Sequence, residues 1–162
     1  MTDNMCNQPK LVTSDFMFCD FEAENQEEFF KKITQLLESK GIVKKEFEQA
    51  LLEREREFPT GLPVGHGVAI PHTDGTYVLE DKLVFIKLKD SIEFNEMGGE
   101  DEDIISTKII IMIVVGNGKN HLQILTELIA AIQAEGFIDG LISAADGNAM
   151  KKIVETYIKS ER

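Results

Sequence analysis

The strongest constraint on the fold is a continuous apolar run, Ile109-Ile110-Ile111-Met112-Ile113-Val114-Val115. Its β-branched side chains favour extended backbone. A strand with one face in water alternates apolar and polar residues, whereas this run is apolar at every position. The run therefore predicts a central strand that is covered on both faces, as in α/β proteins.

Helix and strand patterns alternate around this run, and neither an internal repeat nor a linker interrupts them. The 162 residues suit one domain, so we predict a single α/β domain over 15–162 after a flexible lead-in over 1–14. We expect helices over 25–40, over 45–57, from His121 onward and over 146–159, with a short further segment over 137–142. Strands are expected over 16–21, 68–70 and 82–89. Between these elements we expect an irregular stretch over 59–67, a loop or ragged hairpin over 90–103 and a turn over 116–120.

Composition excludes several classes of function. The formal charge of −12 argues against nucleic-acid binding, which uses clustered Lys and Arg, and it suits a protein partner with a basic face. The sequence contains neither an apolar run of membrane-spanning length nor a signal-peptide pattern at the N-terminus, so we expect a cytoplasmic protein. Cys6 and Cys19 lack metal or redox spacing, and we interpret them as incidental.

The densest group of chemically capable residues is Gly65-His66-Gly67-Val68-Ala69-Ile70-Pro71-His72-Thr73-Asp74. Pro71 fixes its own φ and pushes Ile70 toward extended conformations, so the backbone that presents His72 is stiff. His72 also follows a short strand, where α/β folds tend to bind ligands. These features favour His72 as a nucleophile over a hydrogen-bonded structural histidine.

A histidine that accepts a phosphoryl group needs one bare ring nitrogen and cations or donors near the phosphoryl oxygens. Arg54 could supply a charged planar fork and Thr60 a hydroxyl. His121 follows a Gly-rich turn at a predicted helix start, where free backbone amides favour anions. Arg54 also fits an exposed helical charge pattern, and His121 fits a helix cap or a surface position.

Other catalytic motifs are weaker or missing. His66, His72, His121 and Asp74 could form a zinc site, but their spacing matches no short zinc motif. The acidic run 100–103 lacks the pattern of a calcium loop. The sequence contains no GxSxG, no Walker A motif and no GxGxxG after a strand.

Two segments carry a family resemblance: Leu52-Glu53-Arg54-Glu55-Arg56-Glu57-Phe58-Pro59-Thr60-Gly61 and Val68-Ala69-Ile70-Pro71-His72. Together with the later turn and Leu-rich helix over 117–125, they resemble enzyme IIA of the bacterial sugar phosphotransferase system, fructose/mannitol class. The resemblance spans about residues 12 to 160. Glu-Phe-Pro-Thr-Gly and the additional His66 are most similar to galactitol-type IIA proteins.

The resemblance implies a mixed β-sheet flanked by helices on both sides, and a phosphotransferase component without metal or cofactor. His72 would accept a phosphoryl group from phospho-HPr and pass it to a cysteine of the cognate enzyme IIB. Arg54 and His121 would stabilise the phosphoryl group, with Thr60 and His66 in lesser roles. A membrane IIC would be an indirect partner, and the IIA would not bind the sugar itself.

Two alternatives remain at this point. One is a regulatory phosphorelay protein like the nitrogen-related IIA paralogues, because the histidine chemistry is shared. The other is a zinc-dependent hydrolase that uses the three histidines. The sequence does not identify the sugar or polyol of the pathway, since that molecule never contacts the IIA.

Overall fold

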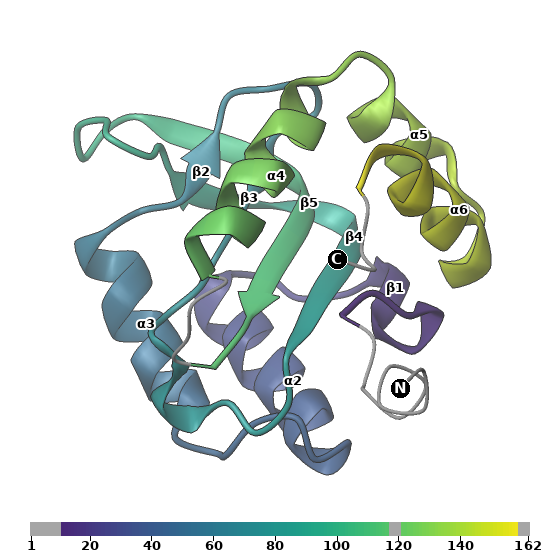
Figure 1. The fold of residues 1–162 in the computed structure, drawn as a ribbon. Helices are drawn as coiled ribbons and strands as arrows, with labels where there is room; N and C mark the ends of the chain where they lie inside the picture. Colours follow the sequence, from purple (N-terminus) through teal and green to yellow (C-terminus); the bar gives the residue numbers. More distant parts are fainter. Residues whose placement is uncertain (1–10, 117–120, 159–162) are drawn as a thin grey trace, which may run out of the picture.

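A computed structural model describes residues 11–116 and 121–158, and these form one mixed β-sheet between two helical layers (Figure 1). The described residues contribute five strands in the order β1-β4-β5-β3-β2. Antiparallel pairing joins β4 to β5 and β2 to β3, whereas β1–β4 and β3–β5 are parallel. The strands are β1 (Met17–Phe21), β2 (Gly61–Leu62), β3 (Val68–Ala69), β4 (Lys82–Asn95) and β5 (Ile104–Val114).

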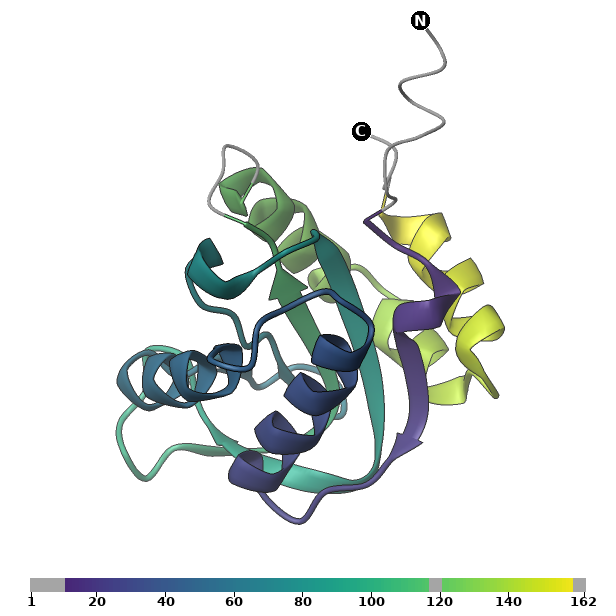
Figure 2. The same ribbon diagram turned by 90° about the horizontal axis from the view of Figure 1, so that it is seen from below.

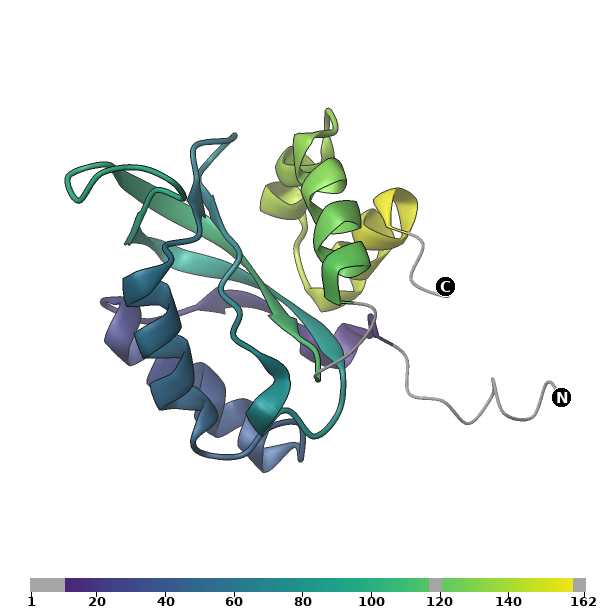
Figure 3. The same ribbon diagram turned by 60° about the vertical axis from the view of Figure 1, so that its left-hand side comes forward.

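Helices cover both faces of the sheet, as Figures 2 and 3 show from two directions. One face carries α2 (Gln26–Ser39) and α3 (Phe47–Glu57), and the other carries α4 (His121–Gln133), α5 (Phe137–Ser143) and α6 (Gly147–Tyr157). The short turns η1 (Ser14–Phe16) and η2 (Gly75–Tyr77) precede β1 and β4. This arrangement confirms the predicted α/β fold with a mixed sheet flanked on both sides.

The β5 strand separates two hydrophobic cores. Ile109, Ile111 and Ile113 pack into the core under α4, α5 and α6, whereas Ile110 and Met112 pack against α2 and α3. All five side chains are at most 1% exposed. Successive side chains on a strand point to opposite faces, so the continuous apolar run is what lets one strand serve both layers.

The structure differs from the predicted strands in two places. The expected loop over 90–103 begins later, because β4 continues to Asn95 after a register shift between Lys87 and Ile92. Ile92 and Phe94 are buried there and alternate with polar residues, a period-2 pattern that the acidic residues beyond it obscured. The expected irregular stretch over 59–67 contains the short strand β2, which pairs with β3.

Parts of two predicted segments lie outside the described residues: 1–10 of the lead-in and 117–120 of the turn. From residue 11 onward the chain packs against the domain. The Leu83 amide donates to the carbonyl of Leu11 at 2.9 Å, and Val12 is 1% exposed in the core. The domain boundary at residue 15, which the sequence analysis predicts, stays a prediction.

Gly67 allows the chain entering β3 to lie directly against β5. Its φ is +85°, and an added Cβ would collide with the carbonyl oxygen of Ser106. In the same place the carbonyl of Gly67 accepts hydrogen bonds from the Lys108 and Ile109 amides, at 3.0 and 3.2 Å. A left-handed conformation and a backbone contact coincide here, so the position requires glycine.

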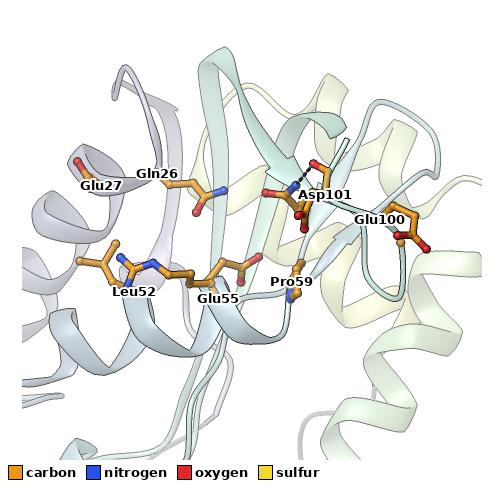
Figure 4. A pocket seen from close by; sticks show the side chains of 10 residues that line it. Gln26, Glu27, Leu52, Glu55, Pro59, Glu100 and Asp101 are labelled. Atoms are coloured by element: carbon orange, nitrogen blue, oxygen red, sulfur yellow. Dashed lines mark hydrogen bonds between the residues drawn. The ribbon is translucent and has the colours of Figure 1, made fainter. Parts of the chain in front are cut away.

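Glu55 on α3 is a buried carboxyl group, 5% exposed. Its Oε2 accepts a hydrogen bond from the Thr60 amide at 2.8 Å, and its Oε1 accepts one from the Thr60 hydroxyl at 2.9 Å. Burial raises the pKa of Glu55 to about 7, against the opposing effect of the two hydrogen bonds. A pocket of about 470 Å³ lies beside it, between α2, α3 and the β4–β5 hairpin (Figure 4).

The first prediction concerns Gly67→Ala. It should lower the free energy of unfolding by about 3 kcal/mol or more, because left-handed strain and a backbone collision act together. Gly98→Ala is the matched control, since Gly98 also has a positive φ, +72°, but an added Cβ would meet nothing within 4 Å. The control should lose about 1 kcal/mol. Urea denaturation measures both values, and equal losses would contradict the close contact with β5.

The second prediction concerns the pH dependence of stability. The pKa of Glu55 rises on folding from 4.5 to about 7, so between these values the folded protein holds a proton that the unfolded chain has released. Stability from this group is therefore present at low pH and is lost as the pH rises through about 7. Glu55→Gln cannot titrate, so wild type should lose about 3 kcal/mol relative to this variant between about pH 4.5 and pH 8. Denaturation of both proteins across this range measures the difference, and a constant difference would refute the raised pKa.

Candidate active site

His72 lies just beyond the carboxyl end of β3, at the edge of the sheet where the parallel strand β5 also ends. It forms a bridge to Ile113 of β5, whose amide donates to the carbonyl of Pro71 at 3.3 Å. The backbone at Pro71 and His72 is thereby held to the central strand. Ligands of α/β folds commonly bind at this edge.

One hydrogen bond assigns the two ring nitrogens of His72. Nδ1 lies 2.7 Å from the carbonyl oxygen of Ile70. A carbonyl can only accept, so Nδ1 carries the proton and Nε2 is bare in the neutral ring. Burial is the largest effect on the pKa of His72 and lowers it. The hydrogen bond to Ile70 raises this pKa, whereas the nearby charges of His121 and Arg54 lower it further. The ring is therefore held neutral, with a free lone pair on Nε2.

His121 is the first residue of α4, and the structure places its ring beside that of His72. The ring centroids are 5.6 Å apart and the planes are inclined by 59°. The two residues meet because β5 ends at the same edge of the sheet as β3, and α4 begins after it. The positive end of the α4 dipole adds to the preference of this edge for an anion.

Arg54 comes from the last turn of α3, and its guanidinium carbon lies 4.2 Å from the centre of the Phe58 ring. Stacking on a ring covers the flat face of a guanidinium and leaves its N–H edges available to an anion. The charge of Arg54 also contributes to the lowered pKa of His72. His121 is therefore in ring contact with His72, and Arg54 lies within electrostatic range of the same ring.

The other two candidate residues have different partners in this structure. The hydroxyl of Thr60 donates to Glu55, and Nε2 of His66 lies 3.4 Å from a carboxylate oxygen of Asp139 on α5. His66 and Asp139 are both largely exposed. Contact of Thr60 or His66 with a phosphoryl group stays a prediction.

Sequence reasoning missed two residues that shape the site. Glu55 precedes Arg56 in a Glu-Arg-Glu-Arg run that resembles an ordinary solvated helix face, although only Glu55 within it is buried. Phe58 enters the sequence analysis only as part of the Glu-Phe-Pro-Thr-Gly segment, and its stacking on Arg54 has no signal there. A period of 3.6 would have placed Glu55 on the same face as Leu51 and thereby signalled its burial.

Exposed apolar side chains flank the site. Phe58, which stacks on Arg54, is 50% exposed, and Leu122, which follows His121, is 73% exposed. Phe58 and Leu122 therefore expose apolar surface next to Arg54 and His121.

Two further findings concern the described parts of the chain. In 11–116 and 121–158, no group of three or more His, Cys, Asp or Glu side chains is arranged to hold a metal ion. In the same ranges, every helix is too short or too polar to cross a membrane.

The chain matches the family model "Phosphoenolpyruvate-dependent sugar phosphotransferase system, EIIA 2" over residues 10–157. It is 26% identical to the galactitol-specific EIIA component of Escherichia coli strain K12 over 121 residues, which are 74% of this chain and 79% of that protein. It is 32% identical to the mannitol-specific EIICBA component of the same strain over 144 residues, which are 86% of this chain and 21% of that protein.

Solved structures give the same result. The complex of Escherichia coli enzyme IIA-mannitol with phosphorylated enzyme IIB-mannitol contains a chain that is similar in fold, with a TM-score of 0.71 and 25% identity. The match covers 90% of this chain and 99% of that one. These comparisons confirm the family resemblance read from the Pro71-His72 segment and the assignment as a phosphotransferase component. The chain belongs to the EIIA 2 family of the phosphoenolpyruvate-dependent sugar phosphotransferase system.

Proposed function

We propose that this protein is a cytoplasmic phosphoryl carrier in which Nε2 of His72 accepts a phosphoryl group from phospho-HPr and passes it to a cysteine of a cognate enzyme IIB. The observation that carries the proposal is the hydrogen bond from Nδ1 of His72 to the Ile70 carbonyl, which leaves Nε2 bare on a ring that contacts His121 and lies within electrostatic range of Arg54.

The proposed reaction is a balanced relay. In the first step the lone pair of Nε2 forms a bond to phosphorus while the bond from phosphorus to the donor histidine breaks. In the second step a thiolate of enzyme IIB attacks the same phosphorus, and the bond to Nε2 breaks. The proton on Nδ1 stays on the ring throughout, held by the Ile70 carbonyl.

Charge stabilisation in this relay falls to Arg54, His121 and the start of α4. The transferring group spreads negative charge over its equatorial oxygens, so positioning and fixed positive charge supply most of the catalysis. Arg54 presents N–H edges rather than a point charge, which suits a planar array of oxygens.

Partner docking would cover the apolar side chains of Phe58 and Leu122 around the site. The net charge of −12 favours a partner with a basic face, as the family resemblance implies for HPr. A membrane IIC would take part indirectly through enzyme IIB, and the sugar would not contact this chain.

Galactitol is the pathway substrate that we propose. It is supported by the match to the galactitol-specific component and by the Glu57-Phe58-Pro59-Thr60-Gly61 segment with His66. The mannitol-specific relative is the competing indication. The rate of phosphoryl transfer from this protein to purified galactitol-type IIB and to mannitol-type IIB distinguishes the two substrates. Faster transfer to the mannitol type would overturn the galactitol proposal.

The third prediction concerns the phosphorylated residue. With enzyme I, HPr and labelled phosphoenolpyruvate, wild type should take up label, whereas His72→Ala should take up none. His66→Ala is the matched control, because His66 lies on the neighbouring loop and contacts Asp139 instead. It should be labelled like wild type. Full labelling of His72→Ala would exclude His72 as the acceptor.

The fourth prediction concerns Arg54. Arg54→Ala should keep the fold and slow phosphoryl transfer by about 100-fold, since it removes a preorganised charged donor from the transition state. Arg56→Ala is the control, because Arg56 belongs to the same helix but lines the pocket beside Glu55. Rapid-quench measurement of transfer from phospho-HPr gives both rates, and similar slowing in the two variants would argue against a specific role for Arg54.

A further inference from the structure

A continuous series of hydrogen bonds joins α3 to the ring of His72. The Glu55 carboxylate accepts from the amide and the hydroxyl of Thr60, at 2.8 and 2.9 Å. The carbonyl of Thr60 accepts from the Ile70 amide at 3.3 Å. The carbonyl of Ile70 then accepts from Nδ1 of His72 at 2.7 Å. The series therefore begins on the residue that follows Arg54 and ends on the proposed nucleophile.

The elements that this series crosses are short. The strands β2 and β3 contain two residues each and pair at the end of the sheet, with Gly61 opposite Ala69. Thr60 and Ile70 are the next residues outward from that pair. On its other side β3 is bound to β5, through the pairing of Ala69 with Ile110 and the bond from the Ile113 amide to Pro71. A two-residue pairing such as β2–β3 resists displacement weakly, so Thr60 is the fixed point for Ile70 on the outer side.

Glu55 supplies that fixed point from a different element. Both carboxyl oxygens accept hydrogen bonds from one residue, which ties Thr60 to α3. Arg54 is the adjacent residue on the same helix. The backbone that carries Arg54 is thus connected to the His72 ring through Glu55, Thr60 and Ile70.

The cost of burial indicates that the carboxyl group has a specific role. Glu55 is 5% exposed, and an apolar side chain at this position would avoid the cost of removing a carboxyl group from water. An apolar side chain would, however, leave the buried amide of Thr60 without this acceptor and would hold the loop by packing alone. Hydrogen bonds restrict both the distance and the direction between two groups, whereas apolar packing restricts direction less strictly.

We propose that Glu55 is a positioning residue that holds Arg54 and His72 in a fixed mutual geometry through Thr60 and Ile70, and that it keeps the Ile70 carbonyl aligned with Nδ1 of His72. This inference rests on the proposed phosphorylation of His72. Glu55 does not touch the phosphoryl group, and it faces the pocket of Figure 4 together with Arg56, Glu27, Glu100 and Asp101.

The test compares two substitutions that differ in hydrogen bonding. In Glu55→Gln the amide oxygen can still accept from the Thr60 amide, and the amide N–H₂ can donate to the Thr60 hydroxyl, which rotates to accept. Glu55→Ala removes both bonds. Glu57→Ala is the matched control, because Glu57 is an exposed residue of the same helix.

Two readouts are measured on the folded proteins. In transfer from phospho-HPr, Glu55→Ala should lower kcat about tenfold with KM unchanged, because geometry at the reacting atoms is lost while the docking surface is intact. Glu55→Gln and Glu57→Ala should stay within about twofold of wild type. Nitrogen NMR of the His72 ring should show the proton fixed on Nδ1 in wild type and distributed between both nitrogens in Glu55→Ala.

Specific outcomes would overturn the proposal. Wild-type kcat and a wild-type ring tautomer in folded Glu55→Ala would do so, and so would equal slowing in Glu55→Gln, since the bonds would then not be the cause. If Glu55→Ala does not fold, Thr60→Val removes one of the two bonds and should give a smaller loss of kcat. An unchanged kcat in that variant would also refute the proposal.

The same experiments separate this inference from the proposed function. If His72→Ala takes up label, the proposed function fails. If wild type is labelled on His72 and Glu55→Ala behaves like wild type, the carrier function stands and the role of Glu55 fails.

Discussion

The whole structure depends on the burial of both faces of β5. Its alternate side chains enter two separate cores, one with α2 and α3 and the other with α4, α5 and α6. Removing apolar area from water is the dominant favourable term in folding, at roughly 25 cal/mol per Å². Close packing on both faces restricts movement of the strand. It is therefore a rigid reference for everything attached to its end.

The proposed active site uses this rigidity. His72 is attached to Ile113 near the end of β5, and His121 begins the helix that follows the same strand. His72 and His121 are distant in the sequence, and their common attachment to β5 holds them close together. Arg54 belongs to the opposite layer, and its link to His72 runs along the short strands β2 and β3. Positional accuracy there depends on hydrogen bonds such as those from Thr60 to Glu55.

The site itself is built for a neutral imidazole near positive charge. Burial and the nearby cations favour the uncharged ring, and the Ile70 carbonyl decides which nitrogen is bare. An imidazole that is neutral at physiological pH needs no general base to become a nucleophile. Arg54 remains available to an incoming anion because the Phe58 ring covers its face rather than its N–H edges.

Much of this could be predicted from the sequence, because the responsible patterns are local. The run over 109–115 determined a two-sided central strand, helical spacing located α2, α3, α4 and α6, and Pro71-His72 identified both the family and the proposed nucleophile. The tertiary structure alone decided the partners of the polar side chains. Glu55 looks like its exposed neighbours in sequence, and His66 lies in the same segment as His72. In the structure Glu55 is buried against Thr60, and His66 lies beside Asp139. Helical spacing from Leu51 could have signalled the burial of Glu55, but the hydrogen-bond partners of these side chains depend on how separate elements meet, and that has no local sequence signal.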